Sequence, residues 1–166
     1  MPFVLIVIGL IGMTITQGRA ARAGVRVAVA LFDNETGDAG FDRLAQVLTD
    51  STVVRLTGNA RLAVIGNAAV LRTSRPFRDL ALIRDTVDAD LIVIGQVQRV
   101  DADVRVLTHL IRASDEAHVW VRPTPLTDAG EAELASAITS AIDEAVRAEV
   151  ASPAERQARP GTVSPR

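Results

Sequence analysis

Four acidic residues fall within ten positions of this sequence, namely Asp33, Glu35, Asp38 and Asp42. The first three belong to the run best suited to bind a ligand, which consists of Asp33, Asn34, Glu35, Thr36, Gly37 and Asp38. Clustered carboxylates beside a glycine are the oxygen donors that Ca²⁺ takes. The spacing is not that of an EF-hand loop, however, and the dipole of a following helix already favours acidic side chains at its start. The run therefore predicts a loop that binds a ligand or a partner, and we expect no metal there.

The two histidines, His109 and His118, are the other candidates for chemistry, because their ordinary pKa lies close to neutrality. A catalytic histidine needs a nucleophile beside it, and the sequence has neither a cysteine nor a G-x-S-x-G motif. Strict alternation along two strands would place His109 on a face with Leu107, and His118 on a face with Trp120 and Arg122. The pattern predicts polar side chains on a half-exposed sheet. We expect no catalytic residue and no cofactor.

Composition narrows the classes of function further. The chain has 166 residues, of which 48% are hydrophobic and 23% charged, which is typical of one folded domain with extensions. The net charge is −2 and the arginines are scattered, so no basic field favours nucleic acid. All 18 basic residues are arginine, so a phosphate-binding P-loop is excluded for want of its lysine. The absence of cysteine excludes disulfides, thiolate metal sites and cysteine-linked lipids.

The elements that would position these residues follow from the spacing of apolar side chains. Apolar runs between turn residues predict five strands, at 25–32, 61–65, 91–100, 104–112 and 118–122. Apolar residues three and four positions apart predict three helices. The first runs from Phe41 to about residue 58, and the second opens at Pro76 and buries Phe77. The third follows Asp128 and Glu131, which resemble a capping box, and its buried stripe consists of Leu134, Ile138, Ile142, Val146 and Val150.

The order of these elements predicts a mixed α/β fold, with helices packed on a five-stranded mixed sheet in the order β-α-β-α-β-β-β-α. The first three strands, joined by helices, are expected to be parallel, and the last three to form an antiparallel meander. Pro123 and Pro125 are expected to end the last strand, because proline cannot donate to a sheet. The acidic run then lies at the carboxyl end of a parallel strand, where such sheets bind ligands.

Both ends of the chain differ from this domain. Residues 3–15 are apolar but too few to cross a bilayer as a helix. Their length matches the apolar region of a signal peptide, and Ala21-Arg22-Ala23 offers a cleavage site. The following Arg19 and Arg22 do not fit the usual polarity of an exported leader. We therefore expect residues 1–23 to be a signal peptide or, alternatively, an uncleaved anchor in the inner membrane. Residues 151–166, rich in proline and arginine, are expected to form a disordered tail.

Three blocks occur in an order and spacing that resemble a known family. They read FDNETGD at Phe32–Asp38, DADLIVIGQV at Asp88–Val97 and HVW at His118–Trp120, with a valine-rich strand at 104–111 before the last. The chain from 25 to 150 thus resembles the TolB-like amino-terminal domain.

This resemblance implies a binding module that carries no catalytic residue set. Members are attached to adenylate cyclases and membrane-bound transcription regulators, and relatives serve as envelope assembly proteins. The leading expectation is a non-enzymatic, periplasmic module for protein–protein interaction, which would contact an envelope protein through the loop at 33–40 and an exposed edge of the meander. It would touch the membrane only through its N-terminal segment, would bind no nucleic acid, and is compatible with a homo-oligomer. The alternative is a regulatory module that senses a small ligand.

Overall fold

The computed structural model describes residues 24–128 and 130–151. The expected leader at 1–23 lies outside these residues, as does the expected tail except for Ala151. Within the described ranges, no helix combines the length and the apolar character needed to cross a bilayer.

The described chain contains six strands, three α-helices and three short 3₁₀ turns. The strands are β1 (Val25–Val29), β2 (Asp33–Asn34), β3 (Leu62–Ile65), β4 (Leu91–Val100), β5 (Asp103–Arg112) and β6 (Ala117–Pro125). The α-helices are α1 (Asp42–Thr57), α2 (Leu80–Val87) and α3 (Glu131–Val150), and the turns are η1 (Ala39–Phe41), η2 (Ala69–Arg72) and η3 (Arg75–Phe77).

The strands form one mixed sheet in the order β3-β1-β4-β5-β6. β1 is parallel to β3 and β4, whereas β4, β5 and β6 form the antiparallel meander. The mixed α/β fold, with its parallel and antiparallel halves, is thereby confirmed. The expectation that the chain after Phe32 is simply a loop is wrong, because β2 pairs in parallel with the second half of β4 and adds a sixth strand.

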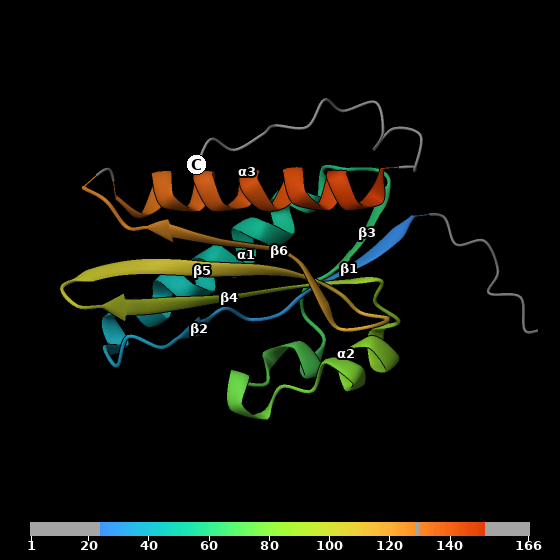
Figure 1. The fold of residues 1–166 in the computed structure, drawn as a ribbon, viewed down its shortest axis with the longest axis horizontal. Coiled ribbons are helices and arrows are strands. Elements are labelled where there is room, and N and C mark those ends of the chain that lie inside the picture. Colours follow the sequence, from blue (N-terminus) through green and yellow to red (C-terminus); the bar gives the residue numbers. More distant parts are fainter. Residues whose placement is uncertain (1–23, 129, 152–166) are drawn as a thin grey trace, which may run out of the picture.

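Helices cover the two faces of the sheet unequally (Figure 1). α1 and α3 pack on one face and bury the larger core, whose fully buried side chains include Phe32, Leu44, Leu48, Ile138 and Ile142. α2 and η2 pack on the opposite face over β1, the first half of β4 and the end of β5, around Leu71, Ile83, Ile92 and Ile111. The start of β5 and most of β6 therefore have a helix on one face alone.

The long last helix confirms the expected stripe, because its apolar positions at intervals of four are buried against the sheet. The expected capping box is wrong, since the N-cap residue is Gly130 and it makes no side-chain hydrogen bond. Gly130 has a φ of 89°, which a residue with a side chain rarely adopts. The backbone thus enters α3 through a glycine, and the amide of Leu134 donates to its carbonyl oxygen.

The second helix begins later than its proline suggested. Pro76 lies in η3, whereas α2 starts at Leu80, where the Asp79 side chain accepts a hydrogen bond from the amide of Leu82. An aspartate at this position satisfies an amide that the helix cannot, which makes it a stronger start signal than proline. The expected burial of Phe77 is wrong, since its side chain is 79% exposed.

The two prolines near the end of the meander do not stop its last strand. β6 continues through Pro123 and Pro125 to residue 125, paired with β5 throughout. The amide of Leu126 donates to the carbonyl of Val104, so the even-numbered residues point their amides at β5. The prolines therefore face the outer edge, where a sheet tolerates them. This edge offers no donor at either position, which argues against the expected addition of a partner strand there.

Candidate functional site

The acidic loop lies at the carboxyl end of β1, as expected, and β2 orients its first residues. Asp33 pairs with Gln96 and Asn34 with Val97, so successive side chains point to opposite faces of the sheet. Asp33 and Glu35 point away from α1, whereas Asn34 points towards it. The carboxylates are thus divided between two faces, and among the described residues no group of three acidic, histidine or cysteine side chains is placed to hold a metal ion.

Asn34 holds the loop in shape through its own hydrogen bonds. Its side-chain Nδ2 donates to the carbonyl of Asp38 at 2.8 Å and to the carboxylate of Asp42 at 2.7 Å. Its Oδ1 accepts hydrogen bonds from both the amide and the hydroxyl of Thr36. The amide of Asp38 donates to the Thr36 hydroxyl, and its side chain accepts from the amide of Gly40. The loop is therefore a preorganised surface, which lowers the entropy lost on binding.

A buried ion pair connects the start of the loop to Arg78, the residue that follows η3. The guanidinium of Arg78 is 3% exposed and lies 2.8 Å from the carboxylate of Asp33, which is 12% exposed. Arg78 also donates to the backbone carbonyls of Leu31 and Thr73. A charge removed from water needs such partners, and here one arginine joins the β1–β2 connection, β2 and the η2–η3 connection.

Glu35 links the loop to the sheet and to η3. Its carboxylate accepts from the guanidinium of Arg75 at 2.7 Å and from the side-chain amide of Gln98 at 3.3 Å. The hydrogen bond and charge of Glu35 raise the pKa of Arg75 above its ordinary value. Gln98 accepts in turn from Arg105 on β5. A polar row thus crosses the face of the sheet that lies opposite α1.

A cleft of about 530 Å³ opens between the loop, the first turns of α1 and η3. Its walls carry carboxylates and guanidiniums on facing sides, from Asp33, Glu35, Asp42, Arg72 and Arg75. The chain leaves β1 towards α1 on one face, and leaves β3 towards η2 and α2 on the other. The cleft therefore occupies the position at which open α/β sheets bind ligands.

The loop also borders the part of the sheet that α2 leaves uncovered. On β5 this face presents Arg105, Leu107 and His109, which alternate with residues buried under α3. On β6 it presents Val121, which is 47% exposed, and Pro123. We call this surface, with Gln98 and Glu35 at its margin, the open face.

The open face also carries both histidines, which the alternation of β6 does not predict. Leu110 pairs with Trp120 but Ile111 pairs with His118, so Val119 is an extra residue in a β-bulge. Val119 and Trp120 both pack against the core under α3. Because a shift of one residue reverses the faces of a strand, His118 points the other way, towards His109. The expectation that His118 shares a face with Trp120 is wrong for this reason.

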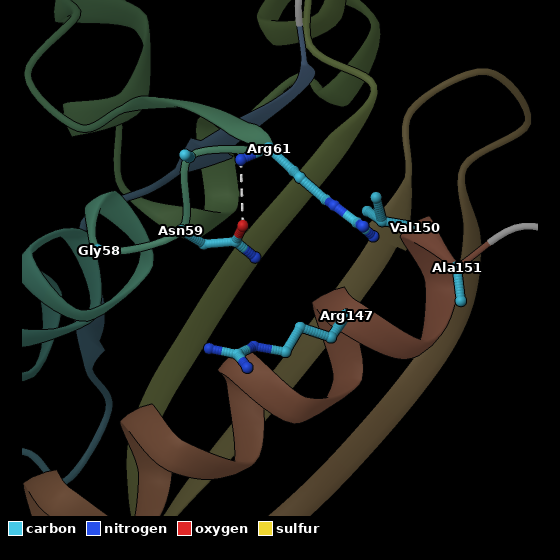
Figure 2. Close-up of a pocket in the computed structure, with 7 residues that line it drawn as sticks. Gly58, Asn59, Arg61, Arg147, Val150 and Ala151 are labelled. Carbon is cyan, nitrogen blue, oxygen red and sulfur yellow. Dashed lines mark hydrogen bonds between the residues drawn. The ribbon is translucent and has the colours of Figure 1, made fainter. Parts of the chain in front are cut away.

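A second cavity, of about 400 Å³, lies where α1 and α3 both end (Figure 2). Arg61 reaches across it towards Val150, and Arg147 extends from α3 into the same space. Arg147 is hydrogen-bonded to the buried carboxylate of Asp143 at 3.0 Å. Carbonyls at the ends of two helices favour nearby positive charge, so the stabilisation of these helix ends accounts for both arginines.

Three residues of the candidate site were not anticipated from the sequence, namely Arg75, Arg78 and Gln98. Arg75 and Arg78 lie 40 and 45 positions after the loop residues that they contact, Glu35 and Asp33. Gln98 lies on a strand predicted from its apolar residues alone, so spacing along the chain contains no signal for any of the three. The FDNETGD block is a local hint of the shape of the loop, because an asparagine side chain commonly hydrogen-bonds the backbone two residues on, as Asn34 does with Thr36.

No protein-family model matches the sequence. No curated protein matches it by sequence either. Solved structures do match its fold. TolB of Acinetobacter baumannii aligns with a TM-score of 0.55 at 12% identity, over 74% of this chain and 28% of TolB. Lipoprotein GNA1162 of Neisseria meningitidis aligns with a TM-score of 0.51 at 15% identity, over 76% of this chain and 99% of the lipoprotein.

This chain therefore spans about a quarter of TolB and corresponds to nearly the whole of the lipoprotein. Identities this low relate the folds and not the binding residues. The element order, the mixed sheet and these two neighbours lead to one conclusion: the chain has a TolB-like fold.

Proposed function

We propose that this chain is a non-catalytic protein-interaction module of the bacterial envelope. One observation carries the proposal. The preorganised loop at 33–38 continues into the open face, a sheet surface that exposes Leu107, Val121 and Pro123 among polar side chains. Interfaces between proteins combine such apolar patches with a polar rim. The TolB-like fold, shared with a lipoprotein, supports a location in the envelope.

The contacts of the two histidines favour binding over catalysis. His109 and His118 hydrogen-bond to each other, and His109 also to Gln96, instead of to a hydroxyl or thiol that they could activate. The carboxylates of the loop likewise face arginines or cap backbone amides. These arrangements stabilise the loop and leave no assembled acid–base pair around the cleft.

Affinity capture from native membranes tests the interaction. The full chain carries a C-terminal tag, and bound proteins are quantified for the wild type and two variants. Ala39→Arg places a bulky charge on the exposed end of the loop, and Ser140→Arg does the same on the exposed side of α3. We expect one envelope protein to be captured by wild type and Ser140→Arg, and to be depleted with Ala39→Arg. Equal capture by both variants would overturn the assignment of the loop.

The proposed location is the periplasm, with residues 1–23 as a cleaved leader or, alternatively, as an inner-membrane anchor. Cell fractionation followed by sequencing of the N-terminus separates these cases. A protein that begins near Gly24 in the periplasmic fraction supports cleavage, and one that retains Met1 in the membrane supports the anchor. Recovery in the cytosol with Met1 retained would contradict an envelope function.

A small-ligand sensor is the second candidate, because one observation specifically favours it. The cleft beside the loop has the size of many ligand sites and lies at the switch point of the sheet. A thermal-shift screen of anionic and cationic metabolites, repeated with Arg75→Ala, tests this reading. A ligand whose stabilisation depends on Arg75 would favour the sensor.

A further inference from the structure

The two histidines of the sequence meet on the open face although they come from different strands. The Nδ1 atoms of His109 and His118 are 3.0 Å apart, and the rings contact edge to face with centroids separated by 5.0 Å. The bulge at Val119 creates this contact, since regular pairing would point His118 towards α3. Bulges that redirect a side chain are over-represented beside functional sites.

The spacing of the two nitrogens suits a metal ion bound between them. Imidazole nitrogens bind first-row divalent metals at roughly 2.0–2.1 Å. Two such bonds to atoms 3.0 Å apart enclose an angle of about 95° at the metal. This angle is close to that between neighbouring ligands of a square-planar or tetragonal ion, and well below the tetrahedral angle that structural Zn²⁺ adopts. The geometry therefore favours Cu²⁺ or Ni²⁺.

Gln96 orients one of the two ligands. Its Oε1 lies 3.2 Å from the Nε2 of His109, and its side chain is buried, at 1% exposure. A carbonyl oxygen accepts hydrogen bonds only, so Nε2 of His109 carries the proton and the lone pair is on Nδ1, which faces His118. Metal-binding histidines almost always donate their second nitrogen to such an acceptor. His118 is exposed and can turn its ring to complete the site.

The charges around the pair allow a cation to bind. Arg75 repels a metal ion, but the carboxylate of Glu35 lies 2.7 Å from its guanidinium and offsets that charge. Because Nε2 of His109 donates to Gln96, its Nδ1 has a lone pair for the ion. His118 offers the Nδ1 lone pair when its ring carries the proton on Nε2.

We propose that His109 and His118 form a bidentate site on the open face for a divalent transition-metal ion, with Cu²⁺ bound most tightly. Cu²⁺ ranks above Ni²⁺ and Zn²⁺ because affinities for nitrogen ligands follow the Irving–Williams order, and the geometry points the same way. Water completes the coordination. The ion bridges β5 to β6 and thereby stabilises the outermost strand of the meander. The site shares the open face with the proposed protein interaction, but the evidence for it does not rest on that interaction.

Titration of the full chain with CuSO₄ tests the site, with calorimetry for affinity and electron paramagnetic resonance for the ligands. We expect one ion per chain with two nitrogen ligands. Either His109→Ala or His118→Ala should weaken binding about tenfold or more and leave a one-nitrogen spectrum. Gln96 acts as a positioning residue, so Gln96→Leu should weaken binding by about 10- to 100-fold with both ligands present.

A variant with the same number of histidines provides the matched control. His118→Ala combined with Ser140→His moves one imidazole to the exposed side of α3, and it should bind like His118→Ala alone. His118 and Ser140 are exposed, so these variants should keep the fold, and circular dichroism is used to check this. Cu²⁺ and Ni²⁺ should raise the Tm of the wild type and Mg²⁺ should not. A wild-type affinity equal to that of the relocated-histidine control would overturn the proposal and leave a simple histidine–histidine hydrogen bond.

Discussion

Gly95 on β4 leaves room for the ring that anchors the start of the acidic loop at 33–38. A Cβ atom at Gly95 would lie 2.4 Å from two ring carbons of Phe32. Phe32 is 2% exposed, and its amide donates to the buried hydroxyl of Thr49 at 2.9 Å, so neither its ring nor its backbone can move away easily. Asp33 follows directly. Replacing Gly95 by alanine should therefore destabilise the fold and displace the loop together.

The size of the effect follows from the overlap. Carbon atoms in contact lie roughly 3.5–4.0 Å apart, so the new methyl group overlaps the ring by more than about 1 Å. Overpacking of this kind costs about 1–3 kcal/mol. Alanine recovers about 0.5–1 kcal/mol, because it has less backbone freedom than glycine in the unfolded chain. Because the methyl group meets a rigid ring, the cost lies in the upper half of that range, and we expect Gly95→Ala to lower the free energy of unfolding by a net of about 1–2.5 kcal/mol.

Urea unfolding followed by circular dichroism measures this change, with Gly58→Ala as the matched control. Gly58 has a φ of −67°, and a Cβ there would meet the Arg55 carbonyl at an ordinary 3.4 Å. Its replacement should leave stability unchanged or raise it by about 0.4–1 kcal/mol. The double variant Gly95→Ala, Phe32→Leu should lose less stability than the sum of the two single variants, because leucine removes the ring that the new methyl group overlaps. Wild-type stability for Gly95→Ala, or strict additivity in the double variant, would refute the reasoning.

Three other substitutions test separate features of the structure. Asp33→Asn leaves the buried Arg78 guanidinium without its carboxylate, so the free energy of unfolding measured with urea should fall by about 3–5 kcal/mol. An unchanged free energy would contradict a structural role for the pair. Thr108→Val removes a hydroxyl that is buried without a hydrogen-bond partner in the described structure, and should raise the free energy of unfolding by about 1 kcal/mol; a fall in Tm would show that the hydroxyl is satisfied. The lowered pKa of folded His109 means that the unfolded chain binds its proton at higher pH, near the ordinary 6.5. Stability should therefore fall as the pH drops through 6.5 towards the lowered pKa and level off below it. His109→Gln should reduce this fall in a series of Tm measurements, and parallel pH profiles would contradict it.

Elements that depend on local periodicity could be predicted from the sequence. The stripe of α3, the alternation of β5 and the valine-rich β1 each bury an apolar face, and burial is the main force that decides between helix and strand. The mixed topology followed from the lengths of the connections, because parallel neighbours need a long crossover and antiparallel neighbours do not.

Features that depend on a neighbour distant in sequence could not be predicted. β2 is only two residues long and exists because β4 continues past β1 and offers it a partner. Pro76 suggested a helix start, but the side chain of Asp79 supplied a better cap. The bulge at Val119 leaves no mark in the apolar pattern, and it alone decides the side of the sheet on which His118 lies.

The same distinction applies to the candidate site. The six loop residues stand out in the sequence because they are polar, acidic and followed by a helix. Their orientation depends on Arg75, Arg78 and Gln98, which the fold brings from η3, the chain after it and β4. The carboxylates of Asp33 and Glu35 thus form separate ion pairs in space, and in the part of the chain that the structure describes no three acidic, histidine or cysteine side chains gather as a metal site would need.

Site-specific photo-crosslinking in living cells tests the central claim most directly. A photoreactive amino acid is placed at Ala39, on the exposed end of the loop, and in a parallel strain at Ser140 on the exposed side of α3. We predict a light-dependent adduct between the Ala39 variant and one envelope protein, with no such adduct from Ser140. Adducts of equal yield at both positions, or an adduct from Ser140 alone, would contradict the account.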